Sequence, residues 1–185
     1  MAGGRIRIGA YMEQQIYLRP MTEEDADVIV AWRNKPELKK FFISQSDFTR
    51  EGHLKWFRTM KESGRACQMM ICDKKDGRPL GSVDIKDIDY DHHKGEYGIF
   101  IGDEEARGRG IGTEAARLML QYGFEVLGLH RIYLRVLAGN ERAIRSYEKA
   151  GFKKEGYLHH DVCINGEYVD IVWMAVVNEE KKSEN

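Results

Sequence analysis

The sequence lacks the features that mark membrane, secreted and nucleic-acid-binding proteins. It contains no run of about 18 apolar residues, the length that a membrane-spanning helix needs. Its first residues, MAGGRIRIGAYMEQQ, lack the long apolar stretch of a signal peptide. The charge is nearly balanced, with 29 Lys and Arg against 30 Asp and Glu, so no basic excess favours a polyanion. We therefore expect neither a membrane nor a nucleic acid as a partner.

Cysteine is also scarce. The chain has three cysteines, Cys67, Cys72 and Cys163, and their spacing matches neither a zinc motif nor a disulfide framework. Each of them lies in an apolar, strand-like run. This pattern predicts buried free thiols in a cytoplasmic protein and gives no sign of a metal site.

The length and composition favour one domain with a hydrophobic core. The chain has 185 residues, of which 42% are hydrophobic, which is enough for one core and rather short for two. We expect this domain at 16–177. The segment 1–15 is predicted to be a flexible tail, and 178–185, with the sequence NEEKKSEN, a disordered one.

Strands and helices alternate along the predicted domain. Strands in the middle of the chain with helices to cover them predict a mixed sheet in an α/β or α+β fold. Hydrophobic periodicity and turn residues place the strands at 16–20, 67–72, 80–88, 96–101 and 131–136, with a final hairpin around Asn165-Gly166, and the helices after Thr22, Thr49, Gly112 and Asn140.

The segment EEARGRGIGTEAARL carries three glycines at alternate positions, 108, 110 and 112. Alternating glycines suit neither a helix nor a strand, so something must approach the main chain closely. No lysine follows Gly112, which disfavours a Walker A loop, and the third glycine of a dinucleotide fingerprint is missing. What remains is a strand, a glycine turn and a helix that begins near Thr113. Backbone amides and the helix dipole would converge there on an anion, with Arg107 and Arg109 beside it.

Two motifs resemble the GNAT N-acetyltransferase superfamily. Arg107-x-x-Gly110-x-Gly112 is similar to the loop that binds the pyrophosphate of acetyl-CoA in that family, and NERAIRSYEKAGF (140–152) is similar to its second signature block. The resemblance covers 16–177. It implies a mixed, mainly antiparallel sheet whose fourth and fifth strands, 96–101 and 131–136, splay apart to admit the pantetheine arm, with helices on both sides.

The resemblance also implies acetyl-CoA as cosubstrate and a set of residues that hold it. The loop amides would bind the pyrophosphate, and the end of the fourth strand would pair with the pantetheine amides. Asn140 is equally suited to a plain helix N-cap, and Tyr147 to a core position against Phe152. The implied cofactor-binding residues are Ile101, Gly102, Arg107, Gly108, Arg109, Gly110, Ile111, Gly112, Thr113, Asn140, Ala143 and Tyr147.

Tyr147 and Glu96 are the catalytic candidates. In the family, the tyrosine at the position of Tyr147 protonates the departing thiolate. Glu96 begins the fourth strand, where related enzymes often carry a glutamate, and would act as a base through water. A solvated carboxylate at a strand end is the alternative. The cysteines lie outside both motifs, so we expect direct attack by the amine in a ternary complex.

The acceptor is predicted from the amino-terminal helices. Trp32 and Arg33, followed by His53 in HLKWF, resemble the branch that acetylates amino-sugar nucleotides, and these three residues are the acceptor-binding candidates. The carboxy-terminal half also resembles the polyamine (spermidine/spermine) and ribosomal-protein N-terminal acetyltransferases. A polyamine would need carboxylates, and the available cluster is Asp84, Asp87, Asp89 and Asp91.

Two further possibilities concern the class of protein and its assembly. A non-catalytic sensor that binds acetyl-CoA would keep both motifs, although the retention of Tyr147 favours an enzyme. Edge strands within 157–176 offer a surface on which a homodimer would pair.

Overall fold

A computed structural model describes residues 14–179 of the chain. The predicted tails at 1–15 and 178–185 lie almost entirely outside these residues. Where they meet the described part, the chain is hydrogen-bonded to the domain. The amide of Gln15 donates to Glu114 Oε1 at 3.0 Å, and the amide of Asn178 donates to the carbonyl of His130 at 2.8 Å.

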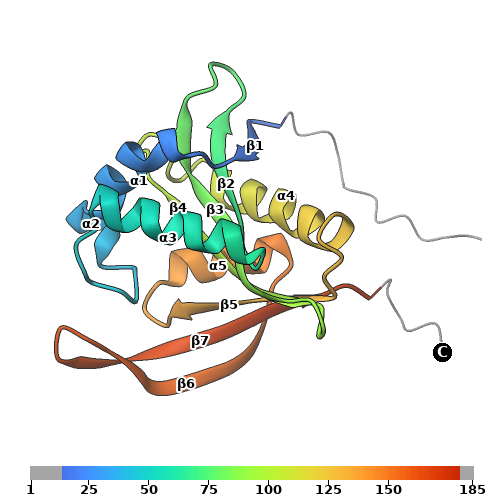
Figure 1. Ribbon diagram of the computed structural model, residues 1–185. Coiled ribbons are helices and arrows are strands. Elements are labelled where there is room, and N and C mark those ends of the chain that lie inside the picture. Colours follow the sequence, from blue (N-terminus) through green and yellow to red (C-terminus); the bar gives the residue numbers. More distant parts are fainter. Residues whose placement is uncertain (1–13, 180–185) are drawn as a thin grey trace, which may run out of the picture.

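The core of the fold is a seven-stranded sheet with the order β1-β2-β3-β4-β5-β7-β6 (Figure 1). All neighbouring strands are antiparallel except β4 and β5, which are parallel. This confirms the predicted mixed, mainly antiparallel sheet. The strands are β1 (Ile16–Pro20), β2 (Cys67–Asp73), β3 (Pro79–Asp89), β4 (Lys94–Ile101), β5 (Arg131–Leu137), β6 (Lys153–Ile164) and β7 (Glu167–Val177).

Helices cover both faces of the sheet (Figure 1). On one face a cluster around Trp32, Phe57 and Met70 packs the first three helices against the strands. On the other face a larger cluster, with Met119 and Ile132 at its centre, packs the last two. The helices are α1 (Ala26–Arg33), α2 (Pro36–Lys39), α3 (Arg50–Ser63), α4 (Ile111–Glu125) and α5 (Glu141–Ala150), with a 3-10 turn, η1 (Glu23–Asp25), before α1.

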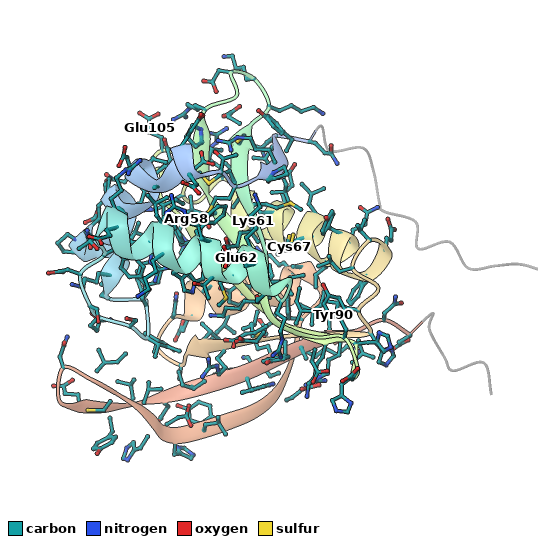
Figure 2. All side chains as sticks on the ribbon, viewed as in Figure 1. Arg58, Lys61, Glu62, Cys67, Tyr90 and Glu105 are labelled. Carbon is teal, nitrogen blue, oxygen red and sulfur yellow. The ribbon has the colours of Figure 1, made fainter. Side chains whose placement is uncertain are left out.

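The sequence specifies where the first helices start. Thr22 and Asp25 form a capping box ahead of α1, as expected from the acidic residues after Thr22. Thr49 caps α3 by accepting a hydrogen bond from the Gly52 amide at 3.1 Å. Along α3 the exposed residues include Arg58, visible in Figure 2. The short helix α2 was not predicted, because four residues give no periodic signal.

The sheet opens between β4 and β5. Their pairing runs only from Lys94 and Arg131 to Glu96 and Tyr133. Beyond this point β4 continues alongside β3, and β5 continues alongside β7. The two strands therefore separate after Glu96, which confirms the predicted splay and leaves one edge of each strand without a neighbour.

The final hairpin extends past the sheet. Only the second half of β7, from Ile171 onward, pairs with β5, so the turn end of β6 and β7 projects beyond the body (Figure 1). Cys163 lies on this arm and is exposed, which corrects its predicted burial; Cys72 is buried and Cys67 partly buried, and all three thiols are free. None of the helices in the described part combines the length and apolar content that crossing a membrane requires.

Candidate active site

A cavity of about 1060 Å³ lies where the two strands separate. Its wall is formed by the residues around α2, the middle of β3, the open ends of β4 and β5, the glycine loop and one side of α5. A cavity of this size is at the upper end of those that bind small molecules and cofactors. Residues of both predicted motifs line this cavity, although the motifs are separate in the sequence.

The glycine loop needs glycine at two of its three positions. Gly108 and Gly110 both have φ of 84°, in the left-handed region that side chains with a Cβ rarely adopt. Gly110 is the N-cap of α4, so the helix starts at Ile111, two residues earlier than expected. Gly112 lies inside the first helical turn, where a Cβ would be 3.5 Å from Ser146 Oγ. Packing alone does not require glycine there, but the residue lines the cavity.

The loop presents consecutive backbone amides. The Arg107 amide donates to Glu104 O and the Thr113 amide to Gly110 O, so the two ends of the predicted 107–113 set are used within the loop. Between them, the amides at 108–112 make no hydrogen bond to any residue that the structure describes. Amides of this kind at the start of a helix form a site for an anion such as a pyrophosphate.

The two arginines of the loop differ in position. The Arg107 guanidinium lines the cavity and donates to the carbonyls of Ile101 and Gly102, at 3.3 Å and 3.4 Å, which ties the loop to the end of β4. Arg109 is exposed and lies outside the cavity wall. Its predicted charge contribution beside the loop stays a prediction.

The open edge of β4 is formed by Ile99 and Ile101. The Gly102 amide donates to Leu80 O on β3 at 2.9 Å, so this N–H is not free to pair with the pantetheine arm. Backbone groups alternate between the two edges of a strand. With Ile101 opposite Gly81 in the register, the N–H and C=O groups of Ile99 and Ile101 therefore point into the gap.

Two side chains at helix α5 have structural roles: one caps the helix and the other joins it to α4. Asn140 is the N-cap, since its Oδ1 accepts from the Ala143 amide at 3.3 Å, and both residues line the cavity. Ser146, which the sequence did not single out, lies 2.9 Å from Thr113 Oγ1 and joins α5 to the start of α4. The sequence also gave no reason to choose the basic residues of α5 that line the same wall, Arg142, Arg145 and Lys149.

Tyr147 is both packed and accessible to the cavity. Its ring makes edge contacts with Tyr97 and Phe152, at centroid distances of 6.1 Å and 5.9 Å, and it also lines the cavity. Burial raises the pKa of Tyr147 to about 12. The hydroxyl therefore keeps its proton at neutral pH, which is the state that a proton donor requires.

Glu96 lies at the last paired position of β4 and is buried, with 7% exposure. Both of its carboxylate oxygens accept hydrogen bonds from Arg135 at 3.2 Å. This excludes the alternative of a solvated carboxylate at a strand end. The ion pair fixes the position of the Glu96 carboxylate at the mouth of the splay.

Asp84 is a second carboxylate in the cavity. It lies opposite Gly98 on β4, where a Cβ would come within 2.8 Å of Asp84 Oδ1. Burial raises the pKa of Asp84 to about 6, and the nearby charges of Lys86 and Arg33 oppose the shift. Of the predicted aspartate cluster it alone lines the cavity. Asp87, Asp89 and Asp91 lie toward the β3–β4 turn, which Figure 2 marks by Tyr90.

Arg33 is the predicted acceptor residue that the structure places in the cavity wall. Its guanidinium lies 4.2 Å from the Phe42 ring centroid and 4.0 Å from that of Phe48, and its Nε has no hydrogen-bond partner among the described residues. Burial lowers the pKa of Arg33, and the charge of Asp84 opposes this. It is a cation on an aromatic surface that faces the cavity.

The other two acceptor candidates are interior residues, which corrects their assignment. Trp32 packs on Gly102, where a Cβ would lie 2.0 Å from the indole ring, so that glycine is needed to admit the tryptophan. His53 is 5% exposed and stacks on Phe57. Neither side chain lines the cavity.

Comparisons with known proteins agree on a family. The family described as Acetyltransferase (GNAT) domain matches residues 15–153. Spermidine N(1)-acetyltransferase of Escherichia coli K12 is 30% identical over 172 residues, covering 92% of this chain and 90% of its own. The same enzyme of Vibrio cholerae is 37% identical over 98 residues, covering 53% and 56%. A crystal structure of spermidine N-acetyltransferase from Vibrio cholerae, in complex with CoA and spermine, superposes with a TM-score of 0.82 at 26% identity, covering 88% and 95%.

Proposed function

The chain belongs to the GNAT acetyltransferase family, and from this premise we propose that the amine it acetylates belongs to a polyamine of the spermidine type. The protein is an acetyl-CoA-dependent N-acetyltransferase, so the alternative of a non-catalytic sensor is set aside. The similarity to spermidine N(1)-acetyltransferase over 92% of the chain carries the choice of acceptor. It favours a polyamine over the amino-sugar nucleotide predicted from the first helices.

In this proposal the cofactor binds along the glycine loop, the edge of β4 and α5. The amides at 108–112 hold the pyrophosphate, and the backbone groups of Ile99 and Ile101 pair with the pantetheine arm as a neighbouring strand would. Asn140, Ala143 and Tyr147 line the path of the arm. This arrangement leaves the thioester at the splay, between the two faces of the sheet.

The two faces then supply opposite proton transfers. Tyr147, on the α5 side, donates its hydroxyl proton to the departing sulfur. Glu96, on the side of α1 to α3, accepts a proton from the amine through water. The amine nitrogen attacks the carbonyl carbon directly, without a covalent enzyme intermediate, because no cysteine lines the cavity.

A second acceptor class is favoured by one observation: the guanidinium of Arg33 lies in the cavity wall, and its Nε has no hydrogen-bond partner among the described residues. A cation held there suits an acceptor that carries a phosphate, as an amino-sugar nucleotide does. The same charge opposes a polycation. Asp84 is the carboxylate next to it that favours an ammonium group.

The experiment is thiol release from acetyl-CoA with a panel of amines. The panel contains spermidine, spermine, an amino-sugar nucleotide and a peptide with a free amino terminus, each over a range of concentrations, with mass spectrometry of the product. We expect spermidine to give the highest kcat/KM. Turnover of the amino-sugar nucleotide with none of the polyamines would show that the acceptor assignment is wrong, while the family's chemistry would stand.

A further inference from the structure

Asp84 and Glu96, two of the carboxylates that line the cavity, differ in how they are held. Both oxygens of Glu96 accept hydrogen bonds from Arg135. Among the described residues no hydrogen bond or ion pair engages the carboxylate of Asp84, although Asp84 lines the same cavity. One carboxylate is therefore fixed by a partner within the protein, and the other is available to a ligand.

The register of the sheet puts these carboxylates on one face. Asp84 pairs with Gly98 and Lys86 pairs with Glu96, so Asp84 and Glu96 are diagonal neighbours on the side covered by α1 to α3. Glu96 is the last residue of β4 that pairs with β5. Asp84 is thus beside the first residues of β4 past the opening, where the acetyl group is expected.

The lack of a side chain at residue 98 belongs to this arrangement. Any Cβ there would lie 2.8 Å from Asp84 Oδ1, closer than van der Waals contact allows. Gly98 therefore lets the Asp84 carboxylate lie flat against the strand beside the gap. Neither Asp84 nor Gly98 belongs to the two motifs from which the family was predicted.

We propose that Asp84 binds the ammonium group of the acceptor and removes its first proton, a role that rests on the proposed amine acetylation. An ammonium must lose a proton before its nitrogen has an electron pair for attack. Asp84 is the carboxylate beside the splay that no hydrogen bond or ion pair with another described residue engages, and the charges of Lys86 and Arg33 favour its ionised form.

The proton balance then uses both carboxylates. The ammonium gives one proton to Asp84, and the free amine nitrogen bonds to the carbonyl carbon. The carbon–sulfur bond breaks with its electron pair on sulfur, which takes the Tyr147 proton. The nitrogen loses its second proton through water to Glu96. One of the two protons restores Tyr147 and the other leaves to solvent, so the products are the N-acetyl amine, CoA thiol and one proton.

Charged groups on the neighbouring elements affect the pKa of Asp84. Lys86 and Asp87 lie on the same strand, Glu96 on β4 and Arg33 at the end of α1. From the segment around α2, Glu37 and Lys40 line the same cavity. Since burial dominates, the pKa of Asp84 is raised to about 6, which places it near the range in which a general base works at neutral pH.

The test is the pH dependence of kcat/KM for an amine that the wild-type protein acetylates, measured in Asp84→Asn. We expect the wild-type value to fall below about pH 6, where Asp84 becomes protonated. Asp84→Asn should be about 100-fold slower at pH 7. Its kcat/KM should rise about tenfold per pH unit toward pH 9, because the amine must then arrive neutral from solution.

Two variants serve as comparisons. Glu96→Gln should keep the wild-type fall below pH 6, because it leaves Asp84 in place. Gly98→Ala, which displaces the carboxylate without removing its charge, should lower kcat/KM over the whole range. Calorimetry with CoA establishes that each variant is folded.

The proposal is overturned if Asp84→Asn matches the wild type, or if it lowers kcat/KM by one constant factor at every pH. Failure of the proposed polyamine acceptor is a separate result. It appears in the wild-type protein, as absence of spermidine turnover, and the pH profile is then measured with the amine of the panel that is acetylated.

Discussion

The cavity has two halves that are built by different means. The half proposed for the cofactor consists of the glycine loop, the edge of β4 and α5, and it presents backbone groups and helix ends together with the basic side chains of the loop and α5. The half proposed for the acceptor, with Arg33, Asp84 and Glu96, presents charged side chains from three separate elements. A cosubstrate shared by a whole family suits backbone recognition, while an acceptor that differs among relatives suits side chains, which substitution changes without altering the fold.

The largest effect on activity is expected at Tyr147, which lies between the two halves of the cavity. Tyr147→Phe removes the proton donor and keeps the ring that packs on Tyr97 and Phe152, so kcat should fall about 100-fold with CoA affinity unchanged. Steady-state thiol release and calorimetry measure the two quantities. The matched control is Tyr97→Phe, which removes a buried hydroxyl without a partner among the described residues and should keep the wild-type rate. A wild-type kcat for Tyr147→Phe would contradict its role as acid.

A smaller effect is expected from a change confined to the cofactor half. Gly110→Ala puts a Cβ on a residue with φ of 84°, at a cost of about 1–2 kcal/mol, so acetyl-CoA should bind about tenfold more weakly. The control, Gly139→Ala, also changes a glycine of the cavity wall, but its Cβ would meet no atom within 4 Å and its φ is not positive. Equal affinities of the two variants, measured by calorimetry, would show that the loop conformation does not matter for binding.

This difference between the halves also explains what the sequence could predict. Gly108 and Gly110 make the loop recognisable in the sequence, because a backbone with positive φ favours glycine. The sheet and its splay followed from the same resemblance. Asp84 could not be placed, because its position beside the splay depends on the register of β3 against β4 and on Gly98 opposite. Trp32 was misassigned for a related reason, since only the packing on Gly102 takes it into the core.

A stability effect of about 1 kcal/mol should arise outside both halves, at the start of α1. Burial alone would raise the pKa of Asp25, but hydrogen bonds from Arg19 and Thr22 at 2.6–2.8 Å lower it overall. A depressed pKa in the folded state contributes stability above the unfolded value of about 4, and this is lost as the pH falls through the folded pKa. Asp25→Asn should therefore lose about 1 kcal/mol at pH 7 and much less at pH 3. Urea unfolding at both values measures this, and an equal loss would contradict the linkage.

The smallest expected effect is a change in KM at Arg33, and it distinguishes the two proposed classes of acceptor. Arg33→Met removes the cation and leaves an apolar side chain against the rings of Phe42 and Phe48, so packing is retained. With a polyamine as acceptor, loss of this like charge should lower KM for spermidine about threefold, the size of one screened repulsion.

Lys40→Met is the matched control for this change. Lys40 is exposed, is also a cation of the cavity wall and lies outside the aromatic stack on Arg33, so its removal should change KM less. If the acceptor is an amino-sugar nucleotide, Arg33→Met should instead raise the KM for it, because its phosphate would lose the guanidinium that binds it. The direction in which KM changes in Arg33→Met therefore distinguishes the two acceptors. A lower KM for spermidine fits a polyamine site that tolerates Arg33, and a higher KM for the amino-sugar nucleotide fits a site that depends on it.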